Sequence, residues 1–527
     1  MPISEQKQRA MKNREIEAAW AYHNGTKHSY QSIRANPHYL DWENQPIPFK
    51  IYSQLEPIPL PQQLSSSGMA ALSAISAVEA QPDSQVALSS QILAEILHLS
   101  AGVTKRRSYP GGEVLFRAAA CTGALYHIDL YLVCGDLPEL EAGVYHFGPH
   151  DFALRSLRQG DYRAVLSRAG GEESSIVNAP AVVICASTYW RNSWKYQARA
   201  YRHCYWDNGT ILANMLAAAA ARHVPARVVA GFVDSEVSRL LALDTRREAA
   251  LSLVALGNTP SRVAGPSPAI ESLKFETQPL SKTEIDYPAM GAMHEASSLE
   301  NEEEVLAWRG AAQREGGMRH GEAGKEGRIF FLQPLSDEEI PRDTIEAVIS
   351  RRGSTRQFSH ESITFTQLST ALDRATRGIP ADFLDQAEAP LNSLYLIVHA
   401  VEDLPPGAYF LQRERRALEL LKEGSFRREA GELGLGQEIP ADCSVDIFFL
   451  ADLNRALERF GNRGYRAAQL EAGMMGGKLY LSAYAQRLGA SGLTFFDDDV
   501  TDFFSPHAAG KSVMFLIALG KSVKQKR

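Results

Sequence analysis

A cluster of three arginines and a serine follows a predicted helix in the segment "IEAVISRRGSTRQFS". Arg351, Arg352, Ser354 and Arg356 lie within six consecutive residues. Because guanidinium groups are planar, forked donors that stay charged, this spacing is suited to clamping a phosphate monoester. A solvated basic turn is the alternative, and the cluster alone does not separate the two.

A run of small residues in the first half of the chain could lie against a flat ligand. It reads "RAAACTGALYHIDLY" from Arg117 and leads into a predicted strand. Small side chains let a backbone approach a ligand closely and point N–H groups toward it. The residues concerned are Ala119, Ala120, Cys121, Thr122 and Gly123. Tight packing where a strand begins explains the same run equally well.

Lys195 and Tyr196 stand side by side in "SWKYQARAYRHCYWDNG". They are either a surface lysine beside a half-buried aromatic residue or two groups that face a substrate. The acidic run at 497–499 opens a predicted helix, where capping and the helix dipole explain it. No metal site is predicted, since the histidines and cysteines show no ligand spacing.

The composition excludes several classes of protein. The chain has 527 residues, of which 45% are hydrophobic and 22% charged, so it is a folded protein large enough for two or more domains. A net charge of -7 argues against nucleic-acid binding. The most apolar long window, 211–233, contains Arg222, His223 and Arg227, so no membrane span is expected. The N-terminus lacks a signal-peptide core and the five cysteines show no CxxC, which predicts a cytoplasmic protein with reduced thiols.

The two halves of the sequence repeat each other at a distance of 264 positions. "GVYHFGPHDFALRSLRQGDYR" begins at Gly143, and "GAYFLQRERRALELLKEGSFR" begins at Gly407. Ordered matches of this kind over more than a hundred residues indicate two copies of one domain. The same shift pairs Lys195-Tyr196 with Arg459-Phe460, and the arginine cluster has no counterpart of the same spacing in the first copy. Divergence in complementary places predicts one composite site.

Each copy predicts the same order of elements. A strand ("LYHIDLYLV"), a second strand ("AGVYHF") and a short helix ("LRSLRQG") are followed by a long alanine-rich helix and a final apolar strand. The class is therefore α+β, with an antiparallel-rich mixed sheet flanked by helices. We expect an N-terminal leader segment (1–60), a first domain (61–261), a linker whose composition leaves little to bury (262–340), and a second domain (341–527).

The segments "RRGSTRQF" and "LGASGLTFFDD" and the doubled layout together resemble the nitroreductase-like flavoprotein superfamily, and within it the SagB-type dehydrogenases, which include azoline oxidases of peptide natural-product pathways. The N-terminal "YHNGTKHSYQSIRANPHYLDWENQPIPFKIY" is similar to the leader of tandem members. The resemblance implies two tandem nitroreductase-like domains that form a pseudo-dimer, with FMN at their interface.

The resemblance also implies a role for each candidate residue. The FMN phosphate would be held by Arg351, Arg352, Ser354 and Arg356. Backbone donors beside the isoalloxazine ring would come from Gly492, Leu493 and Thr494. The ring would be covered by the loop from Ala119 to Gly123, where Ala-Cys replaces the Pro-Ser usual in the family.

Lys195-Tyr196 resembles the Lys-Tyr pair that azoline oxidases use to remove a proton while a hydride passes to the flavin. A lysine half-buried beside an apolar ring system has a pKa lowered toward that of a useful base. The leading hypothesis is thus an FMN-dependent oxidoreductase with one flavin site, acting on a small molecule or a modified peptide. An NAD(P)H-dependent nitroreductase or quinone reductase and a non-catalytic flavoprotein scaffold remain alternatives. The electron donor or acceptor, the occupancy of the second flavin position, and the choice between monomer and homodimer stay open.

Overall fold

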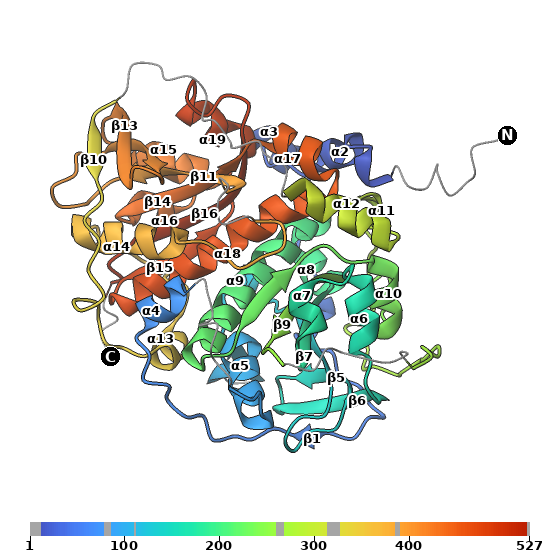
Figure 1. The fold of residues 1–527 in the computed structure, drawn as a ribbon. Coiled ribbons are helices and arrows are strands. Elements are labelled where there is room, and N and C mark those ends of the chain that lie inside the picture. The colour runs from blue at the N-terminus through green and yellow to red at the C-terminus, as the bar shows by residue number, and fades with distance from the viewer. Residues whose placement is uncertain are drawn as a thin grey trace.

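Two seven-stranded sheets organise the fold, one in each half of the chain (Figure 1). The computed structural model describes residues 12–77, 86–109, 112–259, 268–312, 327–384 and 390–523. The first sheet has the order β1 (Ile58–Pro59), β6 (Ala153–Gln159), β5 (Gly143–Gly148), β4 (Ile128–Cys134), β7 (Ala181–Thr188), β9 (Glu248–Leu256) and β8 (Ala226–Val229). The second has the order β10 (Ile329–Phe331), β13 (Ala417–Glu423), β12 (Gly407–Gln412), β11 (Asn392–Val398), β14 (Val445–Ala451), β16 (Ser512–Gly520) and β15 (Gly489–Leu493).

The two sheets have the same topology strand for strand, which makes the chain two tandem α+β domains. Neighbouring strands in both sheets run antiparallel. β4 begins at Ile128 and β11 begins at Asn392, 264 positions later. The central strands β4, β7 and β9 are buried along their whole length, as expected for short, largely apolar runs that are covered on both faces. A separate hairpin joins β2 (Val103–Tyr109) to β3 (Gly112–Arg117).

Helices cover the sheets and fill the space between them. In the first half they are α2 (Glu17–Gly25), α3 (Tyr30–Ala35), α4 (Ala71–Ser76), α5 (Ser90–Ala101), α6 (Arg163–Ala169), α7 (Ser174–Val177), α8 (Tyr189–Tyr196), α9 (Ala200–Ala221) and α10 (Asp234–Leu240). In the second half they are α11 (Pro288–Ala296), α12 (Glu302–Ala312), α13 (Ile345–Arg351), α14 (Phe365–Thr376), α15 (Arg427–Leu433), α16 (Glu438–Asp442), α17 (Leu453–Phe460), α18 (Arg463–Ala485) and α19 (Asp497–Phe504). Short 3₁₀ turns are η1 (Lys12–Arg14), η2 (Trp42–Asn44), η3 (Thr122–Ala124) and η4 (Gln197–Arg199).

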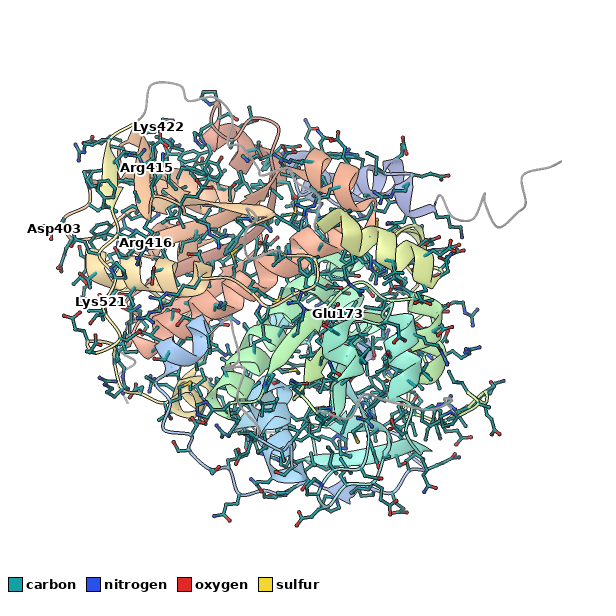
Figure 2. All side chains as sticks on the ribbon, in the orientation of Figure 1. Glu173, Asp403, Arg415, Arg416, Lys422 and Lys521 are labelled. Atoms are coloured by element: carbon teal, nitrogen blue, oxygen red, sulfur yellow. The ribbon has the colours of Figure 1, made fainter. Side chains whose placement is uncertain are left out.

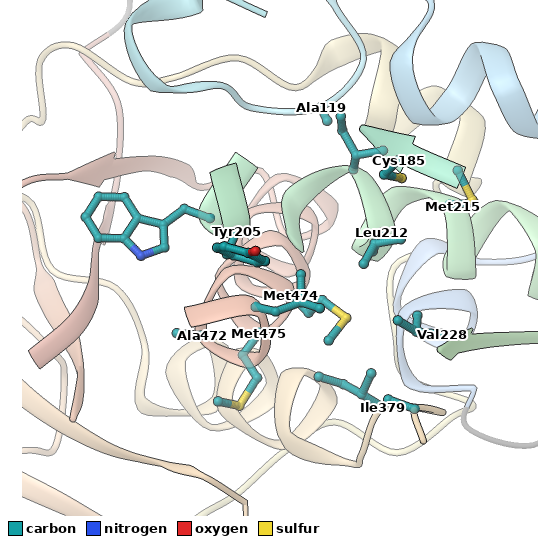
Figure 3. Packing of buried hydrophobic residues seen from close by; sticks show 14 of the residues in the cluster. Ala119, Cys185, Tyr205, Leu212, Met215, Val228, Ile379, Ala472, Met474 and Met475 are labelled. Atoms are coloured by element: carbon teal, nitrogen blue, oxygen red, sulfur yellow. The ribbon is translucent and has the colours of Figure 1, made fainter. Parts of the chain in front are cut away.

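The long helices α9 and α18 join the two domains. They cross at Gly209 and Gly473, which are 264 positions apart, and a Cβ on Gly209 would stand 2.5 Å from the backbone of Gly473. Only glycine permits so close an approach. Around the crossing, Tyr205 and Leu212 of α9 lie beside Met474 of α18 in one continuous hydrophobic core (Figure 3). The crossing is therefore the centre of the predicted pseudo-dimer.

Two equivalent ion-pair groups reinforce this interface. Arg199 and Arg202 of the first domain bind the carboxylate of Asp497 at 2.8 and 2.5 Å. Arg463 and Arg466 of the second domain bind Asp234 at 2.6 and 2.7 Å. All six groups are buried. The acidic run at 497–499 lies in the first turn of α19, as the helix-dipole explanation predicts, but no side chain caps the helix. The carboxylate of Asp497 is instead turned across the domain interface toward the two arginines.

Two further features differ from the sequence predictions. The segment "LRSLRQG" forms strand β6 rather than a helix; Arg155 and Arg158 are buried there, and Arg158 donates to the carbonyls of Arg239 and Leu240. The interval 262–340 contains α11, α12 and β10, and it buries Met290, Met293 and Trp308. Its glycine-rich part at 313–326 lies outside the described residues. The average composition of this interval concealed the few apolar residues that anchor its helices. The bounds of the four predicted segments stay a prediction.

Other charged side chains of the second domain lie on its surface. Figure 2 shows Asp403, Arg416 and Lys422 at the outer edge of the second sheet's side of the molecule. Among the described helices, none combines the length and apolar character needed to cross a bilayer. All five cysteines are free thiols.

Candidate functional site

Lys195 and Tyr196 end helix α8, and the short turn η4 separates them from α9. The Lys195 Nζ lies 5.4 Å from the centre of the Tyr196 ring, and that ring packs edge-on against His203 at 4.5 Å. The next residue, Gln197, ends the helix with φ 51° and ψ −143°, a conformation that glycine usually adopts. Its counterpart after α17 is Gly461, with φ 67° and ψ −160°. The turn that presents the pair is thus conserved in shape between the two copies but strained in the first.

The loop of small residues lies against this pair. A Cβ on Gly123 would stand 2.9 Å from the hydroxyl of Tyr196, and Gly123 has φ 64°. The loop is held by Asp207 of α9. The Asp207 carboxylate accepts hydrogen bonds from the Thr122 N–H at 2.9 Å and from the Thr122 hydroxyl at 2.8 Å. Thr210 adds a hydrogen bond to the Ala120 carbonyl at 2.6 Å. The backbone of the predicted covering loop is therefore held rigidly next to Tyr196.

Asp207 also organises two neighbouring side chains. The Cys121 thiol donates to it at 3.1 Å, and a ring nitrogen of His127 lies 2.8 Å away. The other ring nitrogen of His127 contacts the Ser187 hydroxyl at 2.8 Å. Burial, followed by the charge of Asp207, raises the pKa of Cys121 well above its ordinary value. Cys121 is thus a protonated hydrogen-bond donor at neutral pH, not a thiolate.

Two arginines of the cluster form hydrogen bonds within the protein, and the third forms none with a described residue. Arg351 donates to Asp343 at 2.7 Å and to the Tyr484 carbonyl at 2.8 Å. Arg352 crosses the domain interface and donates to the Ala118 carbonyl at 2.9 Å. Arg356 is exposed and makes no hydrogen bond or ion pair with a described residue. Its guanidinium is the group of the cluster that is free to meet an anion.

The predicted ring-side segment on β15 adjoins the same place. Tyr480 of α18 links the two groups, because its hydroxyl accepts the Gly492 N–H and lies 3.4 Å from the Ser354 hydroxyl. Beyond Leu493, the Thr494 hydroxyl is buried without a hydrogen-bond partner among the described residues, and the Ser491 hydroxyl is in the same state. Buried polar groups are normally paired, so these two hydroxyls indicate a ligand position.

Burial and nearby charges shift the pKa values of Lys195 and Tyr196. Burial lowers the pKa of Lys195, and the positive charge of Arg356 lowers it further. Burial raises the pKa of Tyr196, and the negative charge of Asp207 raises it further. The predicted groups from the two domains thus come together: Tyr196 lies against Gly123, Arg352 binds Ala118, and Ser354 is linked through Tyr480 to Gly492. The charge of Arg356 reaches Lys195.

These groups fit the parts of a flavin mononucleotide. An exposed arginine and a serine can take a phosphate, unpaired hydroxyls at 491 and 494 can take polar ring edges, and a loop with Gly123 at positive φ can lie against a flat ring. The chemistry of the donors therefore agrees with the predicted cofactor.

The pseudo-symmetric position in the other half of the molecule is filled by the chain itself. β8 is the counterpart of β15, and Asp382 accepts the N–H groups of Ala230 at 2.8 Å and Gly231 at 2.9 Å. Residues next to Asp382 pair with β8, since the Val228 N–H donates to the Pro380 carbonyl at 2.8 Å. Amides that correspond to those of the 492–494 segment are thus already satisfied by a carboxylate.

Sequence reasoning missed three residues of this site: Asp207, His127 and Tyr480. The signal for Asp207 was present, because an acid stands two residues before the glycine of the helix crossing in both copies, as Asp207 and Glu471. The partners of these acids lie far away in sequence. Asp207 binds the covering loop, whereas Glu471 accepts the backbone and side-chain N–H groups of Asn392 at 2.8 Å.

The chain is similar to several known proteins. Residues 349–521, which include the arginine cluster and the 492–494 segment, match the Nitroreductase family. The chain contains a nitroreductase-family domain. The microcin B17-processing protein McbC of Escherichia coli is 29% identical over 159 residues, which cover 29% of this chain and 54% of McbC. The trifolitoxin-processing protein TfxB of Rhizobium leguminosarum is 29% identical over 174 residues, 31% of this chain and 46% of TfxB.

The match to these two relatives thus spans about half of their length. A crystal structure of a protein from Anabaena variabilis, named as a nitroreductase, superposes with a TM-score of 0.72 at 24% identity, over 96% of this chain and 99% of that one. The tandem nitroreductase-like fold therefore extends over nearly the whole chain, beyond the segment that the family model matches.

Proposed function

We propose that the protein is an FMN-dependent oxidoreductase of the SagB-type kind, which oxidises the C–H bond next to the ring nitrogen of an azoline-type heterocycle. The observation that carries the proposal is the approach of Tyr196 to the loop at Gly123, with Lys195 beside it. The charge of Arg356 from the second domain acts on Lys195 at the same place. The nitroreductase-family match supports an oxidoreductase. McbC and TfxB are named as processing proteins of microcin B17 and trifolitoxin, which favours a substrate that is modified during its maturation.

Each side chain has a task in this proposal. Ser354 and Arg356 hold the phosphate, while Arg351 and Arg352, which have protein partners, place the cluster against the other domain. Leu493 and Thr494 meet the polar edge of the ring, and the loop 119–123 covers its face. Bound FMN supplies the two-electron acceptor, and dioxygen serves as the terminal oxidant.

Lys195 and Tyr196 handle the protons of the reaction. Oxidation of an azoline to an azole removes a hydride and a proton from neighbouring carbons. The neutral amine of Lys195 takes the proton, and its lowered pKa increases the neutral fraction near physiological pH. Tyr196, with its pKa raised, stays protonated and donates a hydrogen bond to the substrate heteroatom.

The proposal includes one FMN for each chain. At the second position, Asp382 holds the amides of Ala230 and Gly231, and the arginine cluster has no counterpart in the sequence after α4. Reconstitution with excess FMN should therefore give a flavin-to-chain ratio near one by absorbance. A ratio near two, or a protein that takes up no flavin, would contradict this.

The decisive experiment is anaerobic mixing of the flavin-loaded protein with a peptide that contains one thiazoline. Flavin bleaching and a mass loss of two hydrogens in the peptide are expected, and Lys195→Ala should abolish both while retaining the flavin. Arg459→Ala is the matched control, because Arg459 is the counterpart of Lys195 in the other half and donates to the Ala311 carbonyl. Equal loss in both variants would remove Lys195 from the mechanism.

A second candidate is an NAD(P)H-dependent nitroreductase or quinone reductase, which the family match favours. Rapid bleaching by NADPH with no reaction of the thiazoline peptide would establish it. A flavin-loaded protein inert to both would establish the scaffold. The proposal keeps the predicted cytoplasmic location.

A further inference from the structure

One segment beside the candidate site is exposed at every position. Residues 29–39 have no buried or half-buried member, although they include helix α3. Their large apolar side chains stand in solvent: Tyr30 is 65% exposed and Tyr39 86%, and Trp42 just beyond is 67% exposed. A six-residue helix gains little stability in water by itself. An ordered but wholly exposed aromatic segment indicates a surface that binds something.

The pseudo-symmetric counterpart of this segment is packed. His28, just before α3, exchanges hydrogen bonds with Asp497, and Leu299, 271 positions later and just before α12, exchanges the same pair with Asp234. The helices α3 and α12 therefore start from equivalent anchors. Yet α12 buries Val305 and Trp308 completely.

The contacts of α12 show, by pseudo-symmetry, which part of the molecule α3 faces. A Cβ on Gly231 would stand 2.8 Å from the Trp308 ring, and the Arg309 guanidinium lies 3.8 Å from Asp382. Thus α12 covers the second, chain-filled position described above. By the same symmetry α3 stands at the first position, beside the segment 492–494, where no residue equivalent to Asp382 is supplied: the 264-residue shift places Ala118 there.

Direct contacts join the segment to the catalytic pair's helix. A ring nitrogen of His38 lies 2.8 Å from the Trp194 carbonyl, and the Trp42 ring packs edge-on against Trp194 at 5.4 Å. Asn36 reaches the side chain of Gln197 at 3.4 Å. The segment that carries the exposed aromatic residues therefore contacts Trp194 in the last turn of α8 and Gln197 directly after it.

We propose that Tyr30, Tyr39 and Trp42 form a docking surface for the peptide that flanks the reacting heterocycle. The surface is too long for one ring: α3 alone extends about 9 Å, and with the loop to Trp42 it suits roughly three or four extended residues. Aromatic side chains supply large contact area at low cost in conformational entropy. The proposal rests on the proposed function for the chemistry at Lys195, but binding at the surface does not need that chemistry.

The test measures peptide binding and turnover separately. The probe is a fluorescein-labelled eight-residue peptide with one central thiazoline, titrated with flavin-free protein and followed by anisotropy. Replacing Tyr30 and Tyr39 together by Ala should raise its Kd at least tenfold. Phe331→Ala is the control, since Phe331 is 63% exposed but lies on β10 in the second sheet. With flavin-loaded protein, the double variant should lose peptide oxidation yet oxidise free 2-methylthiazoline as the wild type does.

Each outcome decides the proposal. A wild type that does not bind the peptide, or a double variant that binds it unchanged, overturns the docking surface. A double variant that shifts from dimer to monomer in size-exclusion chromatography while binding the peptide normally overturns it too, in favour of a second copy of the chain. Peptide binding that the double variant weakens, with neither thiazoline oxidised by the wild type, supports the surface and refutes the proposed function.

Discussion

The hydroxyl of Tyr196 lies 2.9 Å from the point at which a Cβ on Gly123 would stand. Two segments that are 73 positions apart in sequence, 123 to 196, therefore meet at van der Waals distance without a side chain between them. We expect Gly123→Ala to displace Tyr196 and to lower the free energy of unfolding by about 1–2 kcal/mol from the positive φ alone. In a Tyr196→Phe background the clash is absent, so the substitution should cost less. Urea unfolding of the four proteins measures this; equal costs in both backgrounds would rule out the contact.

The charge of Arg356 sets part of the pKa of Lys195. If the neutral amine is the base, kcat/KM for thiazoline oxidation rises with pH through the pKa of Lys195, which burial and Arg356 hold below the ordinary lysine value. Arg356→Gln removes one positive charge, so the midpoint of this rise should move to higher pH. The profiles are measured at saturating FMN. Arg351→Gln serves as the control because Arg351 is paired with Asp343, and a midpoint that moves equally in both variants would contradict the assignment.

Gln197 stores backbone strain directly after the catalytic pair. Its φ of 51° with ψ −143° costs a non-glycine residue on the order of 1–3 kcal/mol. Gln197→Gly should therefore stabilise the protein by about 1 kcal/mol after the entropic cost of glycine is subtracted. Gln197→Ala removes the same side chain without relieving the strain and should bring no such gain. Urea midpoints of the three proteins give the result, and an equal gain from alanine would place the effect in the side chain.

Glu471 should make stability depend on pH. Burial raises its pKa to about 7, above the ordinary 4.5 of the unfolded chain. Between these values the native state holds a proton that the unfolded state has lost, so this group's contribution to stability is full below pH 4.5 and falls as pH rises to 7. The gap corresponds to at most about 3 kcal/mol. Glu471→Gln should flatten the decline in urea midpoint across this range; an unchanged slope would show that Glu471 is ionised in the native state.

Much of the fold could be predicted from the sequence because the sequence contains two copies of one domain. The shift of 264 positions correctly paired the strands from β4 to β9 with those from β11 to β16, since their alternating and apolar patterns are local properties of the chain. The helix prediction for residues 154–160 was wrong because the structure of this segment depends on contacts with distant residues. Arginine in a short polar run predicts an exposed helix, but Arg158 is buried in β6 by carbonyls of distant residues.

The candidate site divides in the same way. Residue types and spacing pointed to Arg356 and the loop at Gly123, because the groups suited to phosphate and flat rings are few. The role of Lys195 came from the resemblance to azoline oxidases. Asp207 was missed, since its importance lies in contacts with Thr122 and His127 that are 85 and 80 positions away.

The sequence by itself determined the class of the fold, the duplication and the chemical types available at the interface, all of which depend on local pattern and on comparison of the two copies. The tertiary structure decided which groups meet. It brought the charge of Arg356 within reach of Lys195, turned Arg351 toward Asp343, and placed Asp382 on the amides of the second position. These outcomes depend on how two long helices approach at Gly209 and Gly473, and the geometry of a helix crossing is fixed by packing across both domains rather than by any one segment.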